Sequence, residues 1–515
     1  MIVRPELIKE VVLTGGDLTV EKVIGVARFG AAVAIDPEAL ERMQESREAV
    51  EEIVREEKTV YGINTGFGEF SKITVDSLSI RQLQKNLILS HCCGTGAPVS
   101  DETVRALMLL RANALCVGYS GIRPKVVETL VAMINKGVHP IVPEKGSLGA
   151  SGDLAPLSHM ALPLIGLGEA RYEGRRMEGG KAMADAGLEP MVLCAKEGLA
   201  LINGTQMMTA HGVLAFYDAL SAARLADING AVSLEALTGL KTAFDERVHA
   251  VRPHRGQCLS AKNIRLLTEG SENLESCQND RVQDAYALRC MPQVHGAVRD
   301  TLDHVRRVLE IELNSVTDNP IVFKEDGTVI SGGNFHGEPM ALAFDFLGIA
   351  AAELASISER RLERLVNPTL NNGLQPFLTK FGGLHSGYMI CQYSAASLVS
   401  ENKVLAHPAS VDSIPSSANQ EDHVSMGTTA ARKAVAIVDN TLSVLAFELM
   451  AAVQGLDLRG RKPSDSVEAV RQVVRRQVPF LEEDREIRLD IEAINRLVRS
   501  GEIQSLASEL IGDFE

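Results

Sequence analysis

Two long apolar stretches constrain the fold of this chain more than any other feature of its sequence. Residues 342–357 are rich in alanine and apolar on nearly every face of a helix, which is typical of a helix in the middle of a bundle, and residues 428–453 show another long helical pattern. Residues 298–313 keep their apolar side chains on one helical face only. We expect Gly455 to end the second long helix and residues 464–477 to form a late surface helix. The sequence therefore predicts a mainly α fold of long helices.

The N-terminal part of the chain has a different pattern. Residues 11–14 predict a short strand, and Asp36 followed by Pro37 predicts the capped start of a helix that runs to about residue 57. Because 515 residues exceed one ordinary core, we expect two regions. They are a smaller mixed N-terminal region, 1–200, and a long-helix bundle with C-terminal helices, 201–515.

Charge, hydropathy and cysteine content exclude several classes of protein. The net charge of −15 argues against nucleic acid and anionic membranes as partners. Asp345, Glu353 and Glu448 interrupt the longest apolar stretches, so we expect no membrane-spanning helix. The N-terminus lacks the pattern of a secretion signal, and the eight cysteines are scattered apart from Cys92-Cys93. We therefore expect reduced thiols and a cytoplasmic protein.

Several cofactor motifs are missing from the sequence. There is no His-Glu-x-x-His and no paired Cys-x-x-Cys, which leaves a zinc site without support. No glycine-rich segment has the spacing of a dinucleotide loop or a phosphate loop. We expect no metal and no pyridoxal phosphate, and the chemistry must come from the chain itself.

A glycine-rich stretch, residues 146–152, opens the window Gly-Ser-Leu-Gly-Ala-Ser-Gly-Asp-Leu-Ala-Pro-Leu-Ser-His, 146–159. Ala150-Ser151-Gly152 alone is weak, because average usage gives such a triplet by chance in about one chain of this length in five. The whole window is far more specific, and it resembles the active-site segment of the aromatic amino acid ammonia-lyases. The resemblance implies a fold of the fumarase/aspartase-like type.

In that family the triplet cyclises without help into 4-methylidene-imidazol-5-one (MIO). The residue types suit the reaction. The Gly152 nitrogen must attack the Ala150 carbonyl, a strained approach that a residue without Cβ permits. Ser151 then loses water, and its Cβ becomes an electrophilic methylene. Asp153 could steer protons during closure.

Further motifs match the family in order along nearly the whole chain. They carry Tyr61 in a glycine-rich segment, 61–68, then Asn203, Gln283, Tyr286, Arg289, Phe335 and Glu421. The resemblance implies that Tyr61 is the base, that Asn203 and Tyr286 orient the amine and polarise the electrophile, and that Arg289 holds the carboxylate. It further implies that Gln283 supports the tyrosine loop and the carboxylate, and that Phe335 packs the pocket. Gln375 and Cys92-Cys93 depart from the family pattern, away from the chemistry.

The residues Ser90-His91 and Glu421 bear on the substrate. In the family, Ser-His at this position is typical of histidine-specific members, whereas phenylalanine enzymes tend to carry glutamine at the Glu421 position. A buried imidazole needs polar partners at both ring nitrogens, since each unpaired nitrogen costs about 1–3 kcal/mol. His91 and Glu421 could supply them. We therefore expect L-histidine as the substrate and trans-urocanate and ammonia as the products.

Three alternatives remain open at this stage. One is a tyrosine or phenylalanine ammonia-lyase, or an aminomutase, of the same family. The second is a non-catalytic helical scaffold, against which the intact triplet with Tyr61 and Arg289 argues. The third, a pyridoxal-phosphate lyase, lacks a phosphate loop.

The expected site residues are spread over most of the chain and over different long helices. Stiff helices cannot bring both of their ends to one place, so one subunit cannot assemble the whole site. The resemblance implies a homotetramer in which three subunits contribute to each site.

Overall fold

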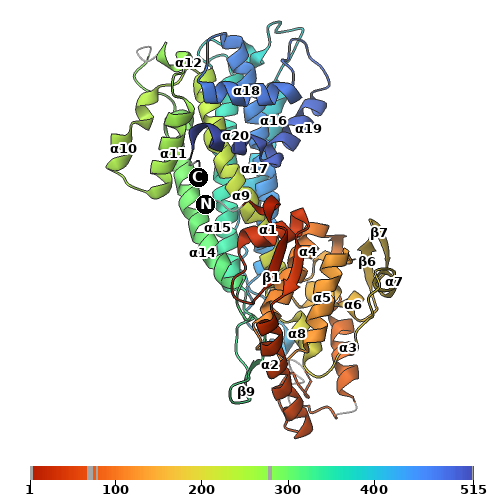
Figure 1. Ribbon diagram of the computed structural model, residues 1–515. Helices are drawn as coiled ribbons and strands as arrows, with labels where there is room; N and C mark the ends of the chain where they lie inside the picture. The colour runs from red at the N-terminus through yellow and green to blue at the C-terminus, as the bar shows by residue number, and fades with distance from the viewer. Residues whose placement is uncertain (1–3, 67–72, 77–78, 277–280, 513, 515) are drawn as a thin grey trace. The chain divides into compact units, whose positions relative to one another are not determined.

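The computed structural model describes residues 4–66, 73–76, 79–276, 281–512 and 514 (Figure 1). The chain is mainly α-helical, as expected, and forms two compact units. Unit 1 comprises Met1–Ala215, Arg306–Asp345 and Pro408–Arg432, and unit 2 comprises Phe216–Val305, Phe346–His407 and Lys433–Glu515. The expected boundary after residue 200 falls inside unit 1, because two later segments fold back into that unit. As a division into folding domains it stays a prediction.

Unit 1 combines short helices with small sheets. Its helices are α1 Val20–Phe29, α2 Pro37–Arg55, α3 Ile80–His91, α4 Asp101–Cys116, α5 Pro124–Lys136, α6 Leu154–Leu164, α7 Gly179–Asp185 and α8 Glu197–Ile202, with 3-10 turns η1 Pro5–Leu7 and η5 Ser417–Asn419. Its strands are β1 Glu10–Leu13, β2 Ala32–Ile35, β3 Thr95–Pro98, β4 His139–Pro140, β5 Pro143–Lys145, β6 Glu169–Tyr172, β7 Arg175–Glu178, β8 Ile321–Phe323 and β9 Thr328–Ile330.

The sheets of unit 1 have two or three strands each. β1 pairs in parallel with β2, in the register Glu10 to Ala32, and β6 pairs antiparallel with both β4 and β7. The expected strand and helix start are confirmed: β1 covers most of residues 11–14, and the Asp36 side chain accepts a hydrogen bond from Glu38 N at the start of α2.

Unit 2 is built on long helices. It contains α10 Glu246–Ala250, α11 Arg255–Leu267, α12 Glu272–Glu275, α13 Tyr286–Arg289, α16 Met389–Leu405, α18 Asp465–Gln477, α19 Ile487–Ser500 and α20 Glu502–Ile511, with η3 Lys241–Phe244 and η4 Pro376–Leu378. The four longest helices, α9 Gln206–Ala236, α14 Met291–Glu312, α15 Glu338–Val366 and α17 Gly427–Arg459, each have residues in both units (Figure 1).

Hydrogen bonds between side chain and backbone tie the long helices together in unit 2. Asn229 on α9 donates to the carbonyl of Leu445 on α17 at 2.7 Å, and Thr441 on α17 donates to the carbonyl of Ala351 on α15 at 3.0 Å. The late surface helix is confirmed as α18, whose N-cap Ser464 accepts from Val467 N and which ends before Pro479.

Two details of the helix predictions were wrong. Gly455 does not end α17, which continues to Arg459 and stops at Gly460 with φ 68°. A Cβ at position 455 would lie 3.2 Å from the Ala236 side chain, so this glycine allows α17 to pack closely on α9. The segment 342–357 is not buried all round either, because Leu342, Phe346 and Ile349 are exposed along one stripe of α15.

By length and composition alone, α15 and α17 could each cross a membrane. However, 67% and 72% of their most apolar windows are buried inside the protein, as in the core helices of a folded domain. The burial therefore accounts for their apolar character.

Candidate active site

The Ala150-Ser151-Gly152 triplet forms a tight turn, as its glycine-rich surroundings predict. Gly149, Ser151 and Gly152 have φ values of 84°, 52° and 75°, and an isolated bridge joins Gly149 to Gly152. Left-handed backbone at Ser151 is a strained conformation for a residue with a Cβ. The strain is concentrated where the triplet must bend.

The triplet lies directly against the segment that carries Asn203. Gly152 bridges to Gly204, and the Gly204 carbonyl accepts a hydrogen bond from Asp153 N at 2.7 Å. A Cβ at position 152 would lie 2.1 Å from Gly204 O, so only glycine fits here.

Asp153, the residue after the triplet, is completely buried. Its carboxylate accepts hydrogen bonds from Ser147 Oγ at 2.8 Å, from Met208 N at 2.8 Å and from Thr428 Oγ1. Burial raises the pKa of Asp153 above its ordinary value, against the smaller opposing effect of these hydrogen bonds. The three donors hold the carboxyl group beneath the turn.

Glu421 contacts the triplet from a segment 270 residues further along the chain. Ser151 Oγ donates to Glu421 Oε1 at 3.2 Å, and Ser416 Oγ donates to Glu421 Oε2 at 3.0 Å. Backbone hydrogen bonds between Ser416 and Glu421 close the loop that presents the carboxylate. The sequence had proposed Glu421 as a site residue, and its contact with Ser151 brings it to the triplet.

His91, the last residue of α3, is half-buried, and its Nδ1 lies 2.9 Å from Ser90 Oγ. Burial lowers the pKa of His91, against smaller opposing effects of the Leu87 backbone and the charge of Glu421. His91 and Glu421 are thus close enough to interact electrostatically.

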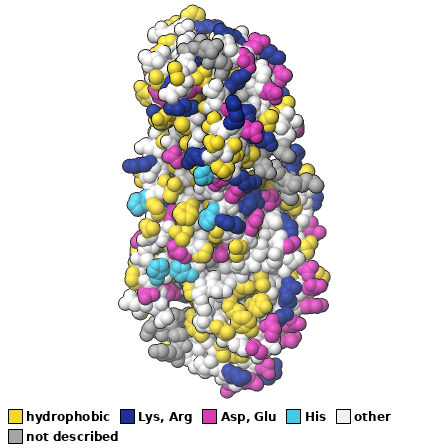
Figure 2. Space-filling model, turned by 90° about the vertical axis from the view of Figure 1, so that its left-hand side faces the viewer, with side chains coloured by type: hydrophobic (Ala, Val, Ile, Leu, Met, Phe, Trp, Pro, Cys, Tyr) yellow, Lys and Arg dark blue, Asp and Glu magenta, His cyan; other side chains and the backbone are white. Residues whose placement is uncertain are grey.

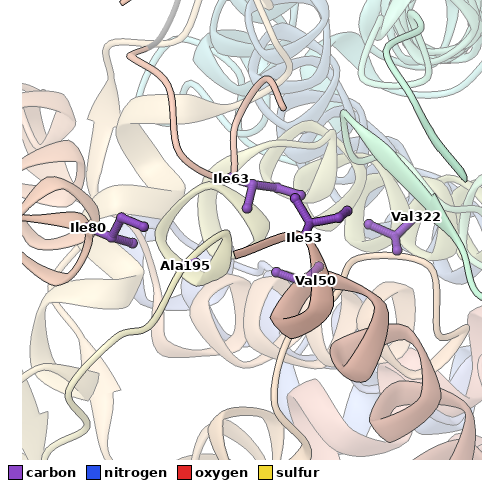
Figure 3. Close-up of a cluster of buried hydrophobic side chains, with 6 residues drawn as sticks. All are labelled: Val50, Ile53, Ile63, Ile80, Ala195 and Val322. Atoms are coloured by element: carbon purple, nitrogen blue, oxygen red, sulfur yellow. The ribbon is translucent and has the colours of Figure 1, made fainter. Parts of the chain in front are cut away.

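The segment that begins at Tyr61 is anchored in a hydrophobic cluster of unit 1. The cluster comprises Val50, Ile53, Ile63, Ile80, Ala195 and Val322 (Figure 3). A Cβ at Gly62 would lie 2.7 Å from the Leu199 side chain of α8 and 2.9 Å from Pro320. Half-buried Tyr61 therefore starts a segment that packs on α8, the helix that Asn203 directly follows. Positions 67 and 68 of the expected loop lie outside the described residues.

Phe335 is half-buried, and the segment around it contacts the segment of Glu421. The rings of His336 and His423 stack with their centroids 5.7 Å apart, and His336 Nε2 lies 3.3 Å from the His423 carbonyl oxygen. Unit 1 therefore gathers Tyr61, His91, the triplet, Asn203, Phe335 and Glu421 within one unit.

The other three expected site residues belong to unit 2. The Arg289 guanidinium lies over the Tyr286 ring, 4.7 Å from its centroid, and both residues are on α13. Tyr286 and Gln283 are exposed and Arg289 is half-buried. This group forms a cationic and aromatic surface.

Sequence reasoning missed three charged residues behind Asn203: Arg111, Lys196 and Asp318, which are at most 1% exposed. In a sequence, such residues look like ordinary surface charges. One signal was available, since Arg111 stands alone in the otherwise uncharged stretch 106–116. Among the described residues, no group of three or more His, Cys, Asp or Glu could hold a metal ion.

A family model described as aromatic amino acid lyase matches residues 18–476. A histidine ammonia-lyase from Caldanaerobacter subterraneus subsp. tengcongensis is 58% identical over 97% of this chain and 99% of the relative. The crystal structure of histidine ammonia-lyase from Trypanosoma cruzi has a TM-score of 0.91 and 44% identity, covering 98% of this chain and 96% of that one. Tyrosine aminomutase from Streptomyces globisporus gives 0.93 and 41%, covering 98% and 99%.

The chain therefore belongs to the aromatic amino acid lyase family. Its fold is the long-helix fold of the fumarase/aspartase-like type, as the resemblance implied.

Proposed function

We propose that the protein is a carbon-nitrogen lyase that deaminates L-histidine to trans-urocanate and ammonia, the first step of histidine degradation. The observation that carries this proposal is the contact between Ser151 and Glu421, with His91 within electrostatic reach of the same carboxylate. A carboxylate thus lies at the triplet and an imidazole lies within electrostatic reach of that carboxylate, which supplies two polar partners for the ring of a histidine substrate. The high identity to histidine ammonia-lyases supports the same substrate.

The turn fits the ring cofactor that the family implies. The residues that would hold it are Ala150, Ser151 and Gly152, in a turn whose close approach to Gly204 leaves no room for a Cβ at Gly152. When formed, the ring supplies an electrophile for the substrate amine, a role that pyridoxal phosphate has in other lyases. Next to the triplet, Asp153 N donates to the Gly204 carbonyl, and Glu421 accepts from Ser151 Oγ, the oxygen that leaves as water when the ring forms.

The remaining roles follow from the chemistry of each side chain. Tyr61 is the base that removes the β-proton, which requires a phenol whose neighbourhood favours the phenolate. Asn203 and Tyr286 orient the amine and polarise the electrophile. Arg289 binds the substrate carboxylate in a bidentate pair. Gln283 supports the loop and the carboxylate, Phe335 packs the pocket, and His91 and Glu421 bind the imidazole.

An ultraviolet spectrum of the purified protein tests this proposal, alone and after mixing with L-histidine, L-tyrosine or L-phenylalanine. The spectrum of the protein alone reports the ring, and the spectrum of the mixture reports the product. We expect the ring absorbance and urocanate from histidine at a kcat/KM far above that for the other two amino acids. Preferred turnover of tyrosine or phenylalanine, or a β-amino acid as product, would contradict it.

We further propose a cytoplasmic homotetramer with shared active sites. The exposed stripe of Leu342, Phe346 and Ile349 on α15, with Ile390 and Tyr393 exposed on α16, supports burial against further copies of the chain. Hydrophobic side chains are also visible among charged ones on the face shown in Figure 2. The seven described cysteines are free thiols, which agrees with a reducing compartment.

Complementation between two inactive variants tests the shared site. Tyr61→Phe and Arg289→Ala are refolded together, and we expect activity above that of either variant alone, because some sites receive the intact residue from each chain. Refolded mixtures without such activity, or a monomeric mass by light scattering in an active sample, would contradict the tetramer.

A further inference from the structure

Asn203 stands in front of the buried charged group that the sequence did not reveal. Lys196 Nζ lies 2.7 Å from Asp318 Oδ2, with the two side chains 0% and 1% exposed. Asp318 Oδ1 accepts from Asn203 Nδ2 at 3.3 Å and from Asn319 N at 2.7 Å. The carboxylate therefore joins a buried cation on one side to the Asn203 amide on the other.

The neighbours of Asn203 determine which end of its amide faces them. The Nδ2 group donates to Asn319 O at 2.9 Å as well as to Asp318 Oδ1. A peptide carbonyl is only an acceptor, and so is an ionised carboxylate. Rotating the amide by half a turn would bring Asn203 Oδ1 against two acceptors. The NH₂ end must therefore point toward Asp318.

The carbonyl oxygen at the other end of the amide, Asn203 Oδ1, has no hydrogen-bond partner among the described residues. The residue is only 2% exposed, so this acceptor is buried. Leaving a buried acceptor unpaired costs about 1–3 kcal/mol, so such an atom calls for a partner that the chain does not supply. Asn203 immediately precedes Gly204, which pairs with Gly152 of the triplet.

Arg111 holds the backbone at the same place. Its guanidinium donates to the Asn203 carbonyl and to Gln206 Oε1 at 2.8 and 2.9 Å, and also to the carbonyl of Ala200. Burial lowers the pKa of Arg111 to about 10, against the smaller opposing effect of Asp318. Asp318 thus accepts hydrogen bonds from Lys196, Asn203 and Asn319, and it meets the Asn203 side chain as an acceptor.

We propose that Asp318, held by Lys196, is a positioning residue that fixes the Asn203 side chain with its carbonyl oxygen free to accept a hydrogen bond from the substrate amine. The inference rests on the proposed function, since it assigns a direction to the contact between Asn203 and the amine. An amide at position 318 no longer fixes the orientation of the Asn203 side chain. Lys196 attracts the carbonyl end of the new amide and turns its NH₂ end toward Asn203, where a hydrogen-bond acceptor is needed.

The first test compares Asp318→Asn with the wild type, at equal ring content measured by absorbance. We expect kcat/KM for L-histidine to fall about 10- to 100-fold, the effect of losing a hydrogen bond to a charged or polar partner. The inhibition constant of 3-(imidazol-4-yl)propionate, which has the ring and carboxylate of histidine but no amine, should change by less than about threefold. A general disturbance of the site would weaken both.

A second variant separates positioning from stability. Lys196→Met combined with Asp318→Leu replaces the buried pair by apolar groups of similar size, a change that is often neutral or stabilising. We expect a melting temperature close to that of the wild type together with the same selective loss on histidine. Should Asp318→Asn alone fail to fold, the double variant still tests whether Asp318 positions Asn203.

The matched control is Glu197→Gln, at the residue that follows Lys196 and begins α8. Glu197 is also 0% exposed and pairs with Arg123 Nε at 2.6 Å, and its hydrogen bonds come from Arg123 and Cys194 rather than from Asn203. We expect a lower melting temperature with kcat/KM within about threefold of the wild type. Wild-type kcat/KM in either test variant, or an equal loss for histidine and the amine-free inhibitor, overturns the inference. A wild-type protein that does not deaminate histidine overturns the proposed function instead.

Discussion

Two aspartates, Asp153 in unit 1 and Asp227 in unit 2, are both completely buried, yet their pKa values move in opposite directions. Burial raises the pKa of Asp153, and its hydrogen-bond donors, a backbone amide and two hydroxyl groups, do not reverse the effect. Burial acts in the same sense on Asp227, but Arg299 and His295 outweigh it and lower the pKa well below its usual range. The difference lies in the charge of the partners.

Asp227 belongs to a network of charged and polar side chains on regular helices. Its oxygens accept from His295 Nδ1 at 2.8 Å and from Arg299 at 2.8 Å, as well as from Ser260 at 2.6 Å. His295 Nε2 in turn lies 3.3 Å from the Arg361 guanidinium, which is paired with buried Glu448. Such a network holds helices in one arrangement.

The network around Asp153 follows the opposite plan. Its partners are neutral, the adjacent backbone is strained at Ser151, and a buried acceptor on Asn203 remains unpaired among the described residues. Proteins retain unfavourable arrangements of this kind mainly at functional sites. The comparison indicates that the charged network around Asp227 stabilises the fold, whereas the neutral network around Asp153 prepares chemistry.

The sharpest test of this division is Ser151→Ala. We expect a folded protein whose turnover of histidine falls by at least about a thousandfold, equivalent to about 4 kcal/mol of transition-state stabilisation, because no water can be lost to form the methylene. Urocanate absorbance gives the rate and circular dichroism the fold. Turnover near that of the wild type would contradict the proposed chemical role of the triplet in unit 1.

Asp227→Asn should have the opposite effect to Ser151→Ala, a large loss of stability with little loss of turnover. Removing the charge that is paired with Arg299 and hydrogen-bonded to His295 inside the protein is expected to cost about 3–5 kcal/mol of unfolding free energy. The ring absorbance and kcat per folded site should stay within about threefold of the wild type. Urea unfolding measures the loss of unfolding free energy, and turnover of histidine normalised to the ring absorbance gives kcat per folded site. A large loss of kcat with unchanged stability would show that the unit 2 network is not merely structural.

Asp153→Asn is the matched substitution in unit 1. An amide cannot accept at both ends, so one of the bonds from Ser147, Thr428 or Met208 N is lost, at about 1–2 kcal/mol of stability. We expect this loss to be smaller than that of Asp227→Asn, together with about a tenfold drop in activity and a lower ring content by absorbance. A stability loss as large as for Asp227→Asn, with full ring content, would contradict the comparison.

Local patterns in the sequence predicted much of this arrangement. The capped start of α2, the non-helical triplet and the long helices all depend on residues close together in the chain. Gly455 was misread for the opposite reason: whether a glycine ends a helix or packs in it depends on Ala236, more than two hundred residues away. The exposed stripe on α15 was also missed, because the sequence does not distinguish an apolar side chain that is buried from one that is exposed.

The candidate site shows the same limit. Family motifs named Tyr61, Asn203 and Glu421, but the contact between Ser151 and Glu421 joins positions 270 residues apart and follows only from the fold. The pair Lys196 and Asp318 is separated by 122 residues. No local pattern distinguishes such charges from solvated ones, and only the burial of both identifies them.

The smallest expected effect concerns how pH acts on the two aspartates. The folded pKa of Asp227 is lowered, so its stabilising contribution is complete above the ordinary value of 3.8 and is lost as pH falls below it. The folded pKa of Asp153 is raised, so the cost of ionising it appears as pH rises above 3.8. Each proton changes the unfolding free energy by at most about 1.4 kcal/mol per pH unit.

Urea unfolding of the wild type, Asp227→Asn and Asp153→Asn between about pH 3 and about pH 6 measures these slopes. The stability advantage of the wild type over Asp227→Asn should shrink as the solution becomes more acidic than about pH 3.8, because the carboxylate takes up a proton in the unfolded state while it stays ionised in the folded state. The stability of the wild type relative to Asp153→Asn should instead fall as pH rises, since only the wild type must ionise a buried acid. Subtracting each variant cancels the titration of all other groups. Two differences with the same slope would show that neutral and charged partners affect a buried aspartate alike, and the distinction between the two networks would not hold.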